Sequence, residues 1–489
     1  MKEQLFELTQ DVSQSKLYNH DLAPTTIKQR TWTTYSYLSL WVGMSFCIPT
    51  FMLAAGLISD SVGMTWWQAI ITIFLGNLIV LVPMILNGHP GTKYGIPFPV
   101  LARASFGTLG ANIPAILRAL VACGWFGIQT YVGGSAINTF VGVIWPGWLT
   151  LGGDFSIVGL SLPQAITFLL FWFINLWIVF RGMNAVKKLE QYAAPVLVLY
   201  IVALFIWAVV AAKGFGPVLS QPGKFKSFGE FFPVFIPSLT GMIGFWATLS
   251  LNIPDFTRFS KDQRSQIRGQ ALGLPTSMGL FSLLSVFIAS ATYIIYGEYI
   301  WDFSVLMSKF ENPIIVLITL LCVMFATLTT NIAANVVSPA NDFSNIAPKH
   351  INFNKGALIT GIIGILIMPW KLLADPSLYI FTWLNTYSGF LGPIAGILIV
   401  DYFILRKKAL NLADLYLEKG EYTYNKGFNV NAIIAVVVGI IVAVIGKIIP
   451  GLKILFDYAW FVGFAVSFFV YWGLMAGKIS EFTGTSKSA

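Results

Sequence analysis

The sequence predicts an all-α integral membrane protein with twelve transmembrane helices. Of its 489 residues, 56% are hydrophobic and only 10% are charged. The mean hydropathy of +0.75 is far above that of a soluble domain of this size. The apolar runs are long and continuous, whereas a membrane β-barrel would have short segments of alternating hydropathy. Two of the runs are also interrupted by glycine, proline and polar residues.

The apolar runs give the order of the spans. They lie near residues 36–58, 66–88, 110–144, 160–180, 191–212, 231–259, 272–296, 313–338, 356–373, 377–404, 429–449 and 453–476. About 20 apolar residues suffice to cross a bilayer, and the third run is long enough to be tilted.

The first ten spans divide into two sets of five. Spans one and six are both interrupted, and spans three and eight are both rich in small and polar residues. Because five is odd, the second set must be inverted relative to the first, with their interface near mid-membrane. The expected divisions are a tail at 1–35, repeats at 36–212 and 231–404, two additional spans at 429–476 and a tail at 477–489.

The loop charges orient the chain. With the N-terminus inside, the inner loops carry about three times as many Lys and Arg residues as the outer loops. We therefore expect a multi-pass protein of the plasma (inner) membrane with both termini in the cytoplasm. The net charge of +9 is spread over loops, so the lipid bilayer is the expected partner and nucleic acid is not. A monomer is sufficient for this architecture. Arg118 alone among the Lys and Arg residues lies within a span, either snorkelling or paired at a gate.

The sixth run, residues 231–260, contains residues that a plain membrane helix does not need. Proline and glycine punctuate it at Pro233, Pro237, Gly241, Gly244 and Pro254. Each proline removes a backbone donor and each glycine weakens the helix. In lipid, a freed backbone group is costly unless protein or a water-filled cavity satisfies it. We therefore predict a break at Gly244, just before Trp246, that faces the protein interior.

The first run contains a matching interruption at Gly43, Ser45 and Pro49. Interrupted helices at corresponding positions of two halves indicate the binding site of a transporter. A single interrupted helix would instead favour a simple kink.

Polar and aromatic residues of three spans are expected to meet near mid-membrane. Trp125 and Gln129 are four residues apart in the third span and share a helical face, as do Asn331 and Asn335 in the eighth. Trp246 follows the break in the sixth. Two indoles and two amides suit a flat heterocycle, because indoles stack on its faces and amides pair with its C=O and N–H groups. The alternative is that these residues only bridge helices.

Oxygen ligands for a monovalent cation are available between the first and eighth spans. Thr329 and Thr330 offer hydroxyl groups, and the first interruption frees carbonyls near Gly43 and Phe46. A set without a carboxylate suits a weakly held monovalent cation, whereas a proton relay would prefer an ionisable group at that depth. The structural alternative is that the threonine hydroxyls bond to their own helix.

These segments resemble the nucleobase–cation symporter-1 family over nearly the whole chain. The resemblance is carried by RTWTTYSYLSLWVG, NGHPGTKYGIPFPVLARASFG, WFGIQTYVGG, ATLSLNIPDFTRF, TTNIAANVVSPA, LGPIAGILIVDYFILRKK and YAWFVGF. The chain is similar in particular to bacterial allantoin permeases and to uracil and allantoin carriers, and more distantly to the hydantoin transporter. The family implies a leucine-transporter-type, five-plus-five inverted repeat with discontinuous first and sixth helices.

The resemblance also implies roles for individual residues. It implies substrate binding by Trp125, Gln129, Gly244, Phe245, Trp246 and Asn335, and a sodium site formed by Gly43, Phe46, Ala326, Thr329 and Thr330. In that site three backbone carbonyls and two hydroxyls would hold the ion. The adjacent hydroxyls favour Na+ over a proton as the coupling ion.

One position departs from the family. Allantoin permeases read HNIP or HNVP in the first span, with the Asn near the substrate, whereas this chain has Cys47 there. We expect Cys47 to line the substrate site. A thiol is a poor donor and a weak acceptor, so the departure is expected to affect recognition of allantoin.

The predicted function is import of a nucleobase or related planar heterocycle, such as allantoin, hydantoin or uracil, by a cation symporter that works by alternating access. The alternatives are a proton-coupled importer of a purine or heterocyclic vitamin, and a non-transporting membrane receptor. An enzyme is not expected, because the spans carry no catalytic dyad, paired carboxylates or metal cluster. No cofactor is expected besides the coupling ion.

Overall fold

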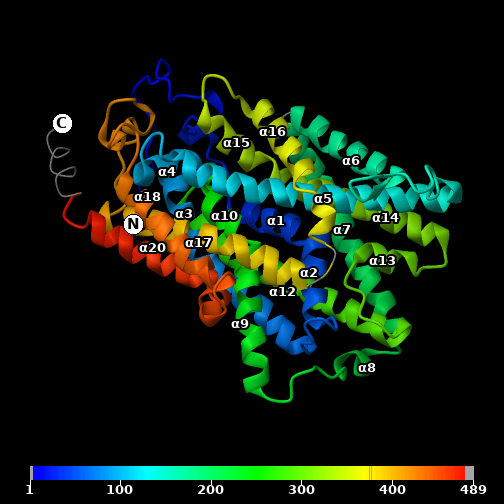
Figure 1. Cartoon of the computed structure of the whole chain (residues 1–489). Helices are drawn as coiled ribbons and strands as arrows, with labels where there is room; N and C mark the ends of the chain where they lie inside the picture. The colour runs from blue at the N-terminus through cyan, green and yellow to red at the C-terminus, as the bar shows by residue number, and fades with distance from the viewer. Residues whose placement is uncertain (1–3, 182, 374, 376, 479–489) are drawn as a thin grey trace.

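The structure, a computed structural model, describes residues 4–181, 183–373, 375 and 377–478. It is a bundle of helices with very little strand (Figure 1). In the described residues, eight helices are long and apolar enough to cross a membrane, and two bent pairs of helices also qualify. Two shorter apolar helices, Pro195–Ala211 and Phe353–Leu366, bring the candidate spans to the predicted twelve.

The first set of five spans is followed by a short connection. Its spans are α1 Thr34–Ser45 with α2 Ile48–Ile58, α3 Trp66–Tyr94, α5 Asn112–Ile144, α6 Leu162–Phe180 and α7 Met183–Ala211. The shorter elements of this half are α4 Phe98–Phe106, β1 Ser156–Ile157, β2 Leu160–Ser161 and α8 Phe215–Leu219. The two strands pair antiparallel in a small hairpin.

The second set and the last two spans follow. They are α9 Phe228–Phe245 with α10 Ala247–Asn252 and α11 Pro254–Thr257, α12 Gln263–Tyr296, α14 Pro313–Asn335 with α15 Val337–Ile346, α16 Phe353–Leu366, α17 Asn385–Ile399, α18 Val430–Val444, and α19 Lys453–Asp457 with α20 Ala459–Met475. A short helix, α13 Phe303–Ser308, precedes α14. Two π-helical stretches, Leu378–Leu384 and Val400–Leu405, extend α17 at both ends to complete the tenth span.

The first span is broken where the sequence predicts. α1 and α2 meet at an angle of 60°, and Phe46 and Cys47 between them are not helical. Pro49 occupies the second position of α2, where its missing N–H costs no helical hydrogen bond.

The sixth span breaks two residues later than predicted. α9 ends at Phe245, and Trp246 itself interrupts the helix before α10. Gly244 has a different task. A β-carbon at Gly244 would lie 2.2 Å from the Oγ atom of Ser388 and 2.9 Å from the carbonyl oxygen of Leu384. Glycine is therefore required for the close approach of the tenth span.

Two spans extend further than their apolar runs. The seventh begins at Gln263 rather than near 272, because Asp262 caps the helix by accepting a hydrogen bond from the Ser265 N–H at 2.7 Å. The eighth continues through α15 to Ile346 rather than ending near 338. The polar residues of α15 are buried against α5 and α16, so hydropathy alone did not reveal this extension.

The ninth span ends earlier than predicted, at Leu366 rather than near 373. Met368 has a φ of 53°, and Pro369 follows it. A left-handed residue before a proline cannot continue an α-helix.

Helices of the two sets pack against each other. α1 lies on α12, α5 on α14, and α3 on α9 and α10. These contacts join spans one and seven, three and eight, and two and six, an arrangement that fits the predicted inverted repeat.

Residues 4–33 pack onto one end of the bundle, called the tail face below. The Thr25 N–H donates to the Gly95 carbonyl at 2.9 Å, and the Tyr416 hydroxyl donates to the Leu22 carbonyl at 2.8 Å. Figure 1 shows this segment in dark blue at the same end as the orange loop that carries Tyr416. The part of the predicted tail that the structure describes is thus a docked segment.

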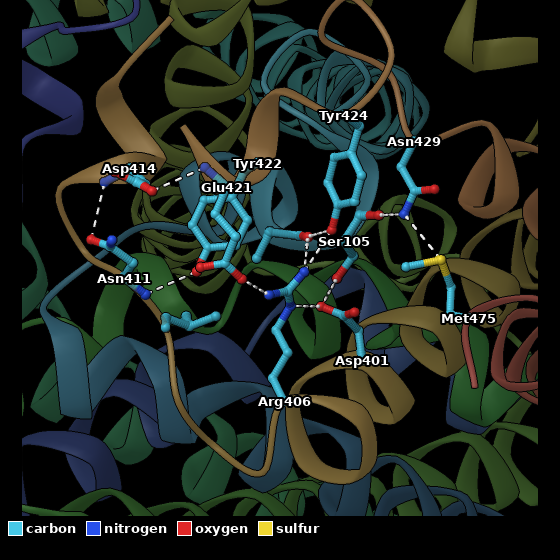
Figure 2. A network of polar contacts seen from close by, with 12 residues as sticks. Ser105, Asp401, Arg406, Asn411, Asp414, Glu421, Tyr422, Tyr424, Asn429 and Met475 are labelled. Atoms are coloured by element: carbon cyan, nitrogen blue, oxygen red, sulfur yellow. Dashed lines mark hydrogen bonds and ion pairs between the residues drawn. The ribbon is translucent and has the colours of Figure 1, made fainter. Parts of the chain in front are cut away.

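A buried ionic network on the tail face ties the tenth span to the twelfth (Figure 2). The Arg406 Nε lies 2.9 Å from an Asp401 carboxylate oxygen, and Arg406 also pairs with Glu421. Burial raises the pKa of the Glu421 carboxyl, and Arg406 acts in the opposite direction. Asp401 also accepts hydrogen bonds from Ser105 at 2.9 Å and from Tyr471 of α20 at 2.8 Å. Because each buried charge has a partner, the network anchors the last span to the repeat.

Candidate functional site

An aromatic cluster surrounds the break of the sixth span. The Trp125 ring of α5 lies 5.1 Å from the Phe245 ring, Phe245 lies 5.0 Å from Trp246, and Trp246 lies 5.1 Å from Trp41 of α1, all between ring centroids. The three pairs meet edge to face, with interplanar angles of 75°, 86° and 90°. Phe245 thus lies between the two predicted stacking residues. The structure brings Trp125 and Trp246 into one cluster but not into face-to-face alignment.

The buried polar atoms of this cluster that lack partners among the described residues include the Nε1 atoms of Trp41 and Trp246 and, beside them, the Oε1 of Gln129. Gln129 lies one turn after Trp125 on α5 and is 3% exposed. Within the part of the chain that the structure describes, no hydrogen bond reaches the Oε1 of Gln129 or the Nε1 of Trp246. One is an acceptor and the other a donor. An unmade buried hydrogen bond costs about 1–3 kcal/mol, so the site favours a ligand that carries both N–H and C=O groups.

The two asparagines of α14 have different environments. The Asn331 side chain donates to Thr130 at 3.2 Å and to Asn175 at 3.2 Å, so it bridges three helices. Asn335, the last residue of α14, donates to the Asn331 Oδ1 at 3.1 Å. Asn331 therefore orients Asn335, whose role in substrate binding stays a prediction.

The predicted cation ligands meet between α1 and α14. The Thr330 hydroxyl donates to the Gly43 carbonyl at 3.3 Å. The Thr329 hydroxyl donates to the Ala326 carbonyl of its own helix at 3.0 Å. Phe46 and Ala326 line one small cavity. The donor set consists of neutral oxygens, which suits a monovalent cation, but the Thr329 bond is also what an ordinary helix would make.

Cys47 lies in the break of the first span. Its Sγ is 3.2 Å from the Thr50 Oγ1, and it lines the same small cavity as Phe46, together with Tyr200 of α7. Its role as a substrate-lining residue stays a prediction.

The sequence analysis did not single out Tyr387 of α17. The Tyr387 hydroxyl accepts a hydrogen bond from the Trp125 Nε1 at 3.3 Å and donates one to the Gly244 carbonyl at 2.8 Å. A tyrosine in an apolar run has no local pattern that reveals such partners.

A second polar cluster lies on the tail-face side of the site. Arg118 NH1 lies 3.2 Å from an Asp342 carboxylate oxygen, and both side chains are fully buried. Arg118 NH2 also donates to the Asn252 Oδ1 of α10 at 2.9 Å, and Asn252 donates to Ser338 of α15. Arg118 is seven residues before Trp125, about 10 Å along the helix. Arg118 is thus paired rather than snorkelling. The sequence analysis missed Asp342 because it lies beyond the apolar run of the eighth span.

A polar-lined cavity lies on the other side of the site. A cavity of 170 Å³ is lined by Ile48, Met52, Tyr131, Val132, Ser135, Asn138, Thr139, Gln164, Asp302 and Leu373. Ser135 lies six residues beyond Gln129, about 9 Å along α5 and away from Arg118. The aromatic cluster therefore lies between the Arg118 cluster, called the seal below, and this polar-lined cavity, called the vestibule below.

The chain was compared with known protein families and with individual proteins. A family model described as permease for cytosine/purines, uracil, thiamine, allantoin matches residues 24–463. The chain is 43% identical over 461 residues to the allantoin permease of Bacillus subtilis (strain 168), a match that covers 94% of each chain. It is 45% identical over 474 residues to the purine-uracil permease NCS1 of Arabidopsis thaliana, covering 94% of this chain and 78% of that protein.

A solved structure has a similar fold over nearly the whole chain. The match is to Mhp1, a nucleobase-cation-symport-1 family transporter, in a closed conformation with bromovinylhydantoin bound. The TM-score is 0.78 at 25% identity, and the match covers 95% of this chain and 96% of that one. The predicted family resemblance and the predicted fold class are confirmed.

The Arg118–Asp342 pair makes a testable contribution to stability. Asp342→Asn keeps the side-chain volume but removes the carboxylate that pairs directly with the buried Arg118 cation, so we expect a loss of roughly 3–5 kcal/mol in unfolding free energy. Arg118→Met combined with Asp342→Leu removes both charges and should recover most of that loss. Thermal unfolding in detergent measures both variants. The exposed Asp154→Asn is the control, and equal stability of Asp154→Asn and Asp342→Asn would contradict the argument.

Proposed function

Since the chain belongs to the nucleobase–cation symporter-1 family of permeases for cytosine/purines, uracil, thiamine and allantoin, we propose that it imports a planar nitrogen heterocycle by cation symport. The relatives are permeases, so the protein is a transporter and not an enzyme. Allantoin, uracil and a hydantoin are the first candidate substrates, because the relatives of the chain are named for them.

The observation that carries the substrate class is the pair of unpartnered atoms beside the aromatic cluster. The Gln129 Oε1 can accept from a ring N–H, and the Trp246 Nε1 can donate to a ring C=O. Trp125 and Trp246 supply indole surfaces on which a flat ring can stack. A purely aliphatic substrate would leave both polar atoms unpaired and would be rejected for that reason.

The charges at the two ends support an orientation of the protein in the membrane. The tail face carries the N-terminal segment and the Lys-rich loops, which the positive-inside rule assigns to the cytoplasm. The Arg118 seal then closes the inner side, and the vestibule opens to the outside. Transport requires a second arrangement, in which Asn252 leaves Arg118 and the vestibule closes. We place the protein in the plasma (inner) membrane on the same grounds.

Sodium is the proposed coupling ion. The Gly43 and Phe46 carbonyls belong to the broken first span, whereas Ala326, Thr329 and Thr330 belong to α14. A site shared by these two elements is complete in one arrangement of the bundle and broken in another. An ion that binds one arrangement better shifts the population toward it and raises substrate affinity by the same factor that substrate raises ion affinity.

Two experiments test the proposed function. A thermal-shift panel of uracil, allantoin, hydantoins, purines and B vitamins, with and without sodium, identifies ligands because binding stabilises the folded state. Counterflow of the labelled ligand in proteoliposomes then separates transport from binding. Ligand binding without counterflow would mean a receptor and would refute the proposal.

The stacking residues give the first functional prediction. Trp125→Ala and Trp246→Ala should each weaken substrate binding by roughly 1–3 kcal/mol, the range for ring stacking on aromatic side chains. Equilibrium binding to purified protein is the measurement, and Trp145→Ala on the exposed opposite end is the control. Wild-type affinity in both site variants would show that the substrate binds elsewhere.

The departure at Cys47 gives a prediction about selectivity. Cys47→Asn restores the residue expected in allantoin permeases and should change the ranking of competing substrates without abolishing transport. The reason is that a polar site rejects analogues that leave its own groups unpaired. Competition assays against one labelled substrate measure the ranking, and an unchanged ranking would place Cys47 outside the site.

The coupling ion gives a further prediction. Sodium should raise substrate affinity by about 5- to 150-fold, a coupling of about 1–3 kcal/mol. Thr330→Ala removes one oxygen ligand and should erase most of this dependence while changing sodium-free affinity much less. Substrate affinity is titrated against sodium and, separately, against pH. Affinity that ignores sodium, together with uptake that collapses when the proton gradient is dissipated, would identify a proton as the coupling ion.

A further inference from the structure

Two tyrosines of the tenth span contact both broken helices. The Tyr387 hydroxyl donates to the Gly244 carbonyl beside the break of the sixth span, at 2.8 Å. The Tyr379 hydroxyl donates to the Pro49 carbonyl just after the break of the first span, at 3.5 Å. Tyr379 is 0% exposed and Tyr387 is 2% exposed. The tenth span thus touches each discontinuity through one buried hydroxyl.

The same two side chains flank Trp125. Its ring centroid lies 6.0 Å from that of Tyr379 and 6.5 Å from that of Tyr387, in edge contacts at 85° and 76°. The Trp125 Nε1 also donates to the Tyr387 hydroxyl at 3.3 Å. The Tyr387 hydroxyl therefore accepts a hydrogen bond from Trp125 and donates one to the Gly244 carbonyl, so both its acceptor and its donor functions are used.

The π-helical geometry of the tenth span brings the two tyrosines toward one face. An α-helix turns about 100° per residue, so residues eight apart would point about 80° away from each other. The stretch Leu378–Leu384 is π-helical, and its wider turn advances by fewer degrees per residue. Tyr379 lies in this stretch and Tyr387 follows it. The irregular winding thereby directs both hydroxyls to the same group of partners.

Close packing holds the tenth span against both neighbours. A β-carbon at Gly124 of α5 would lie 2.5 Å from the Trp383 ring, and one at Gly241 of α9 would lie 3.3 Å from Ile380. These glycines, like Gly244, allow the helices to approach. A hydroxyl on the tenth span is therefore held at a fixed distance from both α5 and α9.

We propose that Tyr387 is a positioning residue for the substrate site: its hydroxyl fixes the Trp125 indole relative to the Gly244 break. The proposal rests on the proposed function, because it assigns Trp125 as the stacking surface. Tyr387 does not need to touch the substrate. It sets the orientation in which the Trp125 indole meets the substrate, and Tyr379 makes a further edge contact with the same indole.

The rival explanation is that the Tyr387 hydroxyl only satisfies two buried polar groups and stabilises the fold. The two explanations differ in what happens when Trp125 loses its N–H. Trp125→Phe keeps an aromatic ring but has no donor for Tyr387. If Tyr387 acts through the Trp125 indole, loss of the Tyr387 hydroxyl should weaken substrate binding much less in the Trp125→Phe variant than in the wild type.

The first experiment needs no ligand. Indole N–H resonances of 15N-tryptophan-labelled protein are recorded in detergent, and the Trp125 peak is identified by its absence in Trp125→Phe. Tyr387→Phe should shift the Trp125 peak and speed its hydrogen exchange. Tyr471→Phe removes an equally buried hydroxyl in the tail-face network and should leave the Trp125 peak in place. An unmoved Trp125 peak in Tyr387→Phe overturns the proposal, whatever the protein transports.

The second experiment is a double-mutant cycle on substrate affinity, with labelled allantoin and labelled uracil as probes. Tyr387→Phe should weaken binding of the bound probe about 3- to 10-fold in the wild-type background, the range for one hydrogen bond. The loss should be under twofold in the Trp125→Phe background. Equal losses in the two backgrounds overturn the proposal and leave Tyr387 with a structural role. Failure of the wild type to bind either probe would count against the proposed substrates, while the ligand-free experiment still decides the role of Tyr387.

Discussion

The need to satisfy every backbone N–H and C=O group inside a bilayer governs this structure. The first and sixth spans are broken, and each break frees backbone groups that a continuous helix would pair. Side chains from other spans contact carbonyls beside both breaks: Thr330 reaches Gly43, and Tyr387 reaches Gly244. The broken first and sixth spans therefore depend on side chains of the eighth and tenth spans to pair their free carbonyl groups. The candidate cation and substrate sites lie at these contacts, where the breaks make backbone groups available for binding.

Buried charges provide a second constraint, and they are concentrated toward one end. Arg118 with Asp342, and Arg406 with Asp401, lie on the tail-face side of the aromatic cluster. Each pair is joined to neutral partners such as Asn252. Buried ion pairs hold particular arrangements more than they add stability. Asn252 is joined to Arg118 by a single hydrogen bond to a charged group, whose net contribution is about 1.5–3 kcal/mol. A seal of this kind can open when ligand binding shifts the population by a few kcal/mol.

Much of the architecture was determined by local sequence. Hydropathy located the spans because burial in lipid acts on each run separately. The break of the first span followed from Pro49 and its neighbours, because proline and glycine alter the backbone where they stand. The shared face of Trp125 and Gln129 followed from helical spacing. The family motifs, read directly from the sequence, indicated the fold class that the comparisons then confirmed.

Tertiary structure determined which residues of these elements contact one another. Asp342 pairs with Arg118 across 224 residues, and Tyr387 pairs with Trp125 across 262 residues. Phe245 lies between the two predicted stacking tryptophans, and residues 4–33 are docked on the tail face. Composition and periodicity describe one segment at a time, whereas a hydrogen bond between distant segments depends on how helices pack. Sequence therefore determined which residues are available to the site, and packing determined which of them meet.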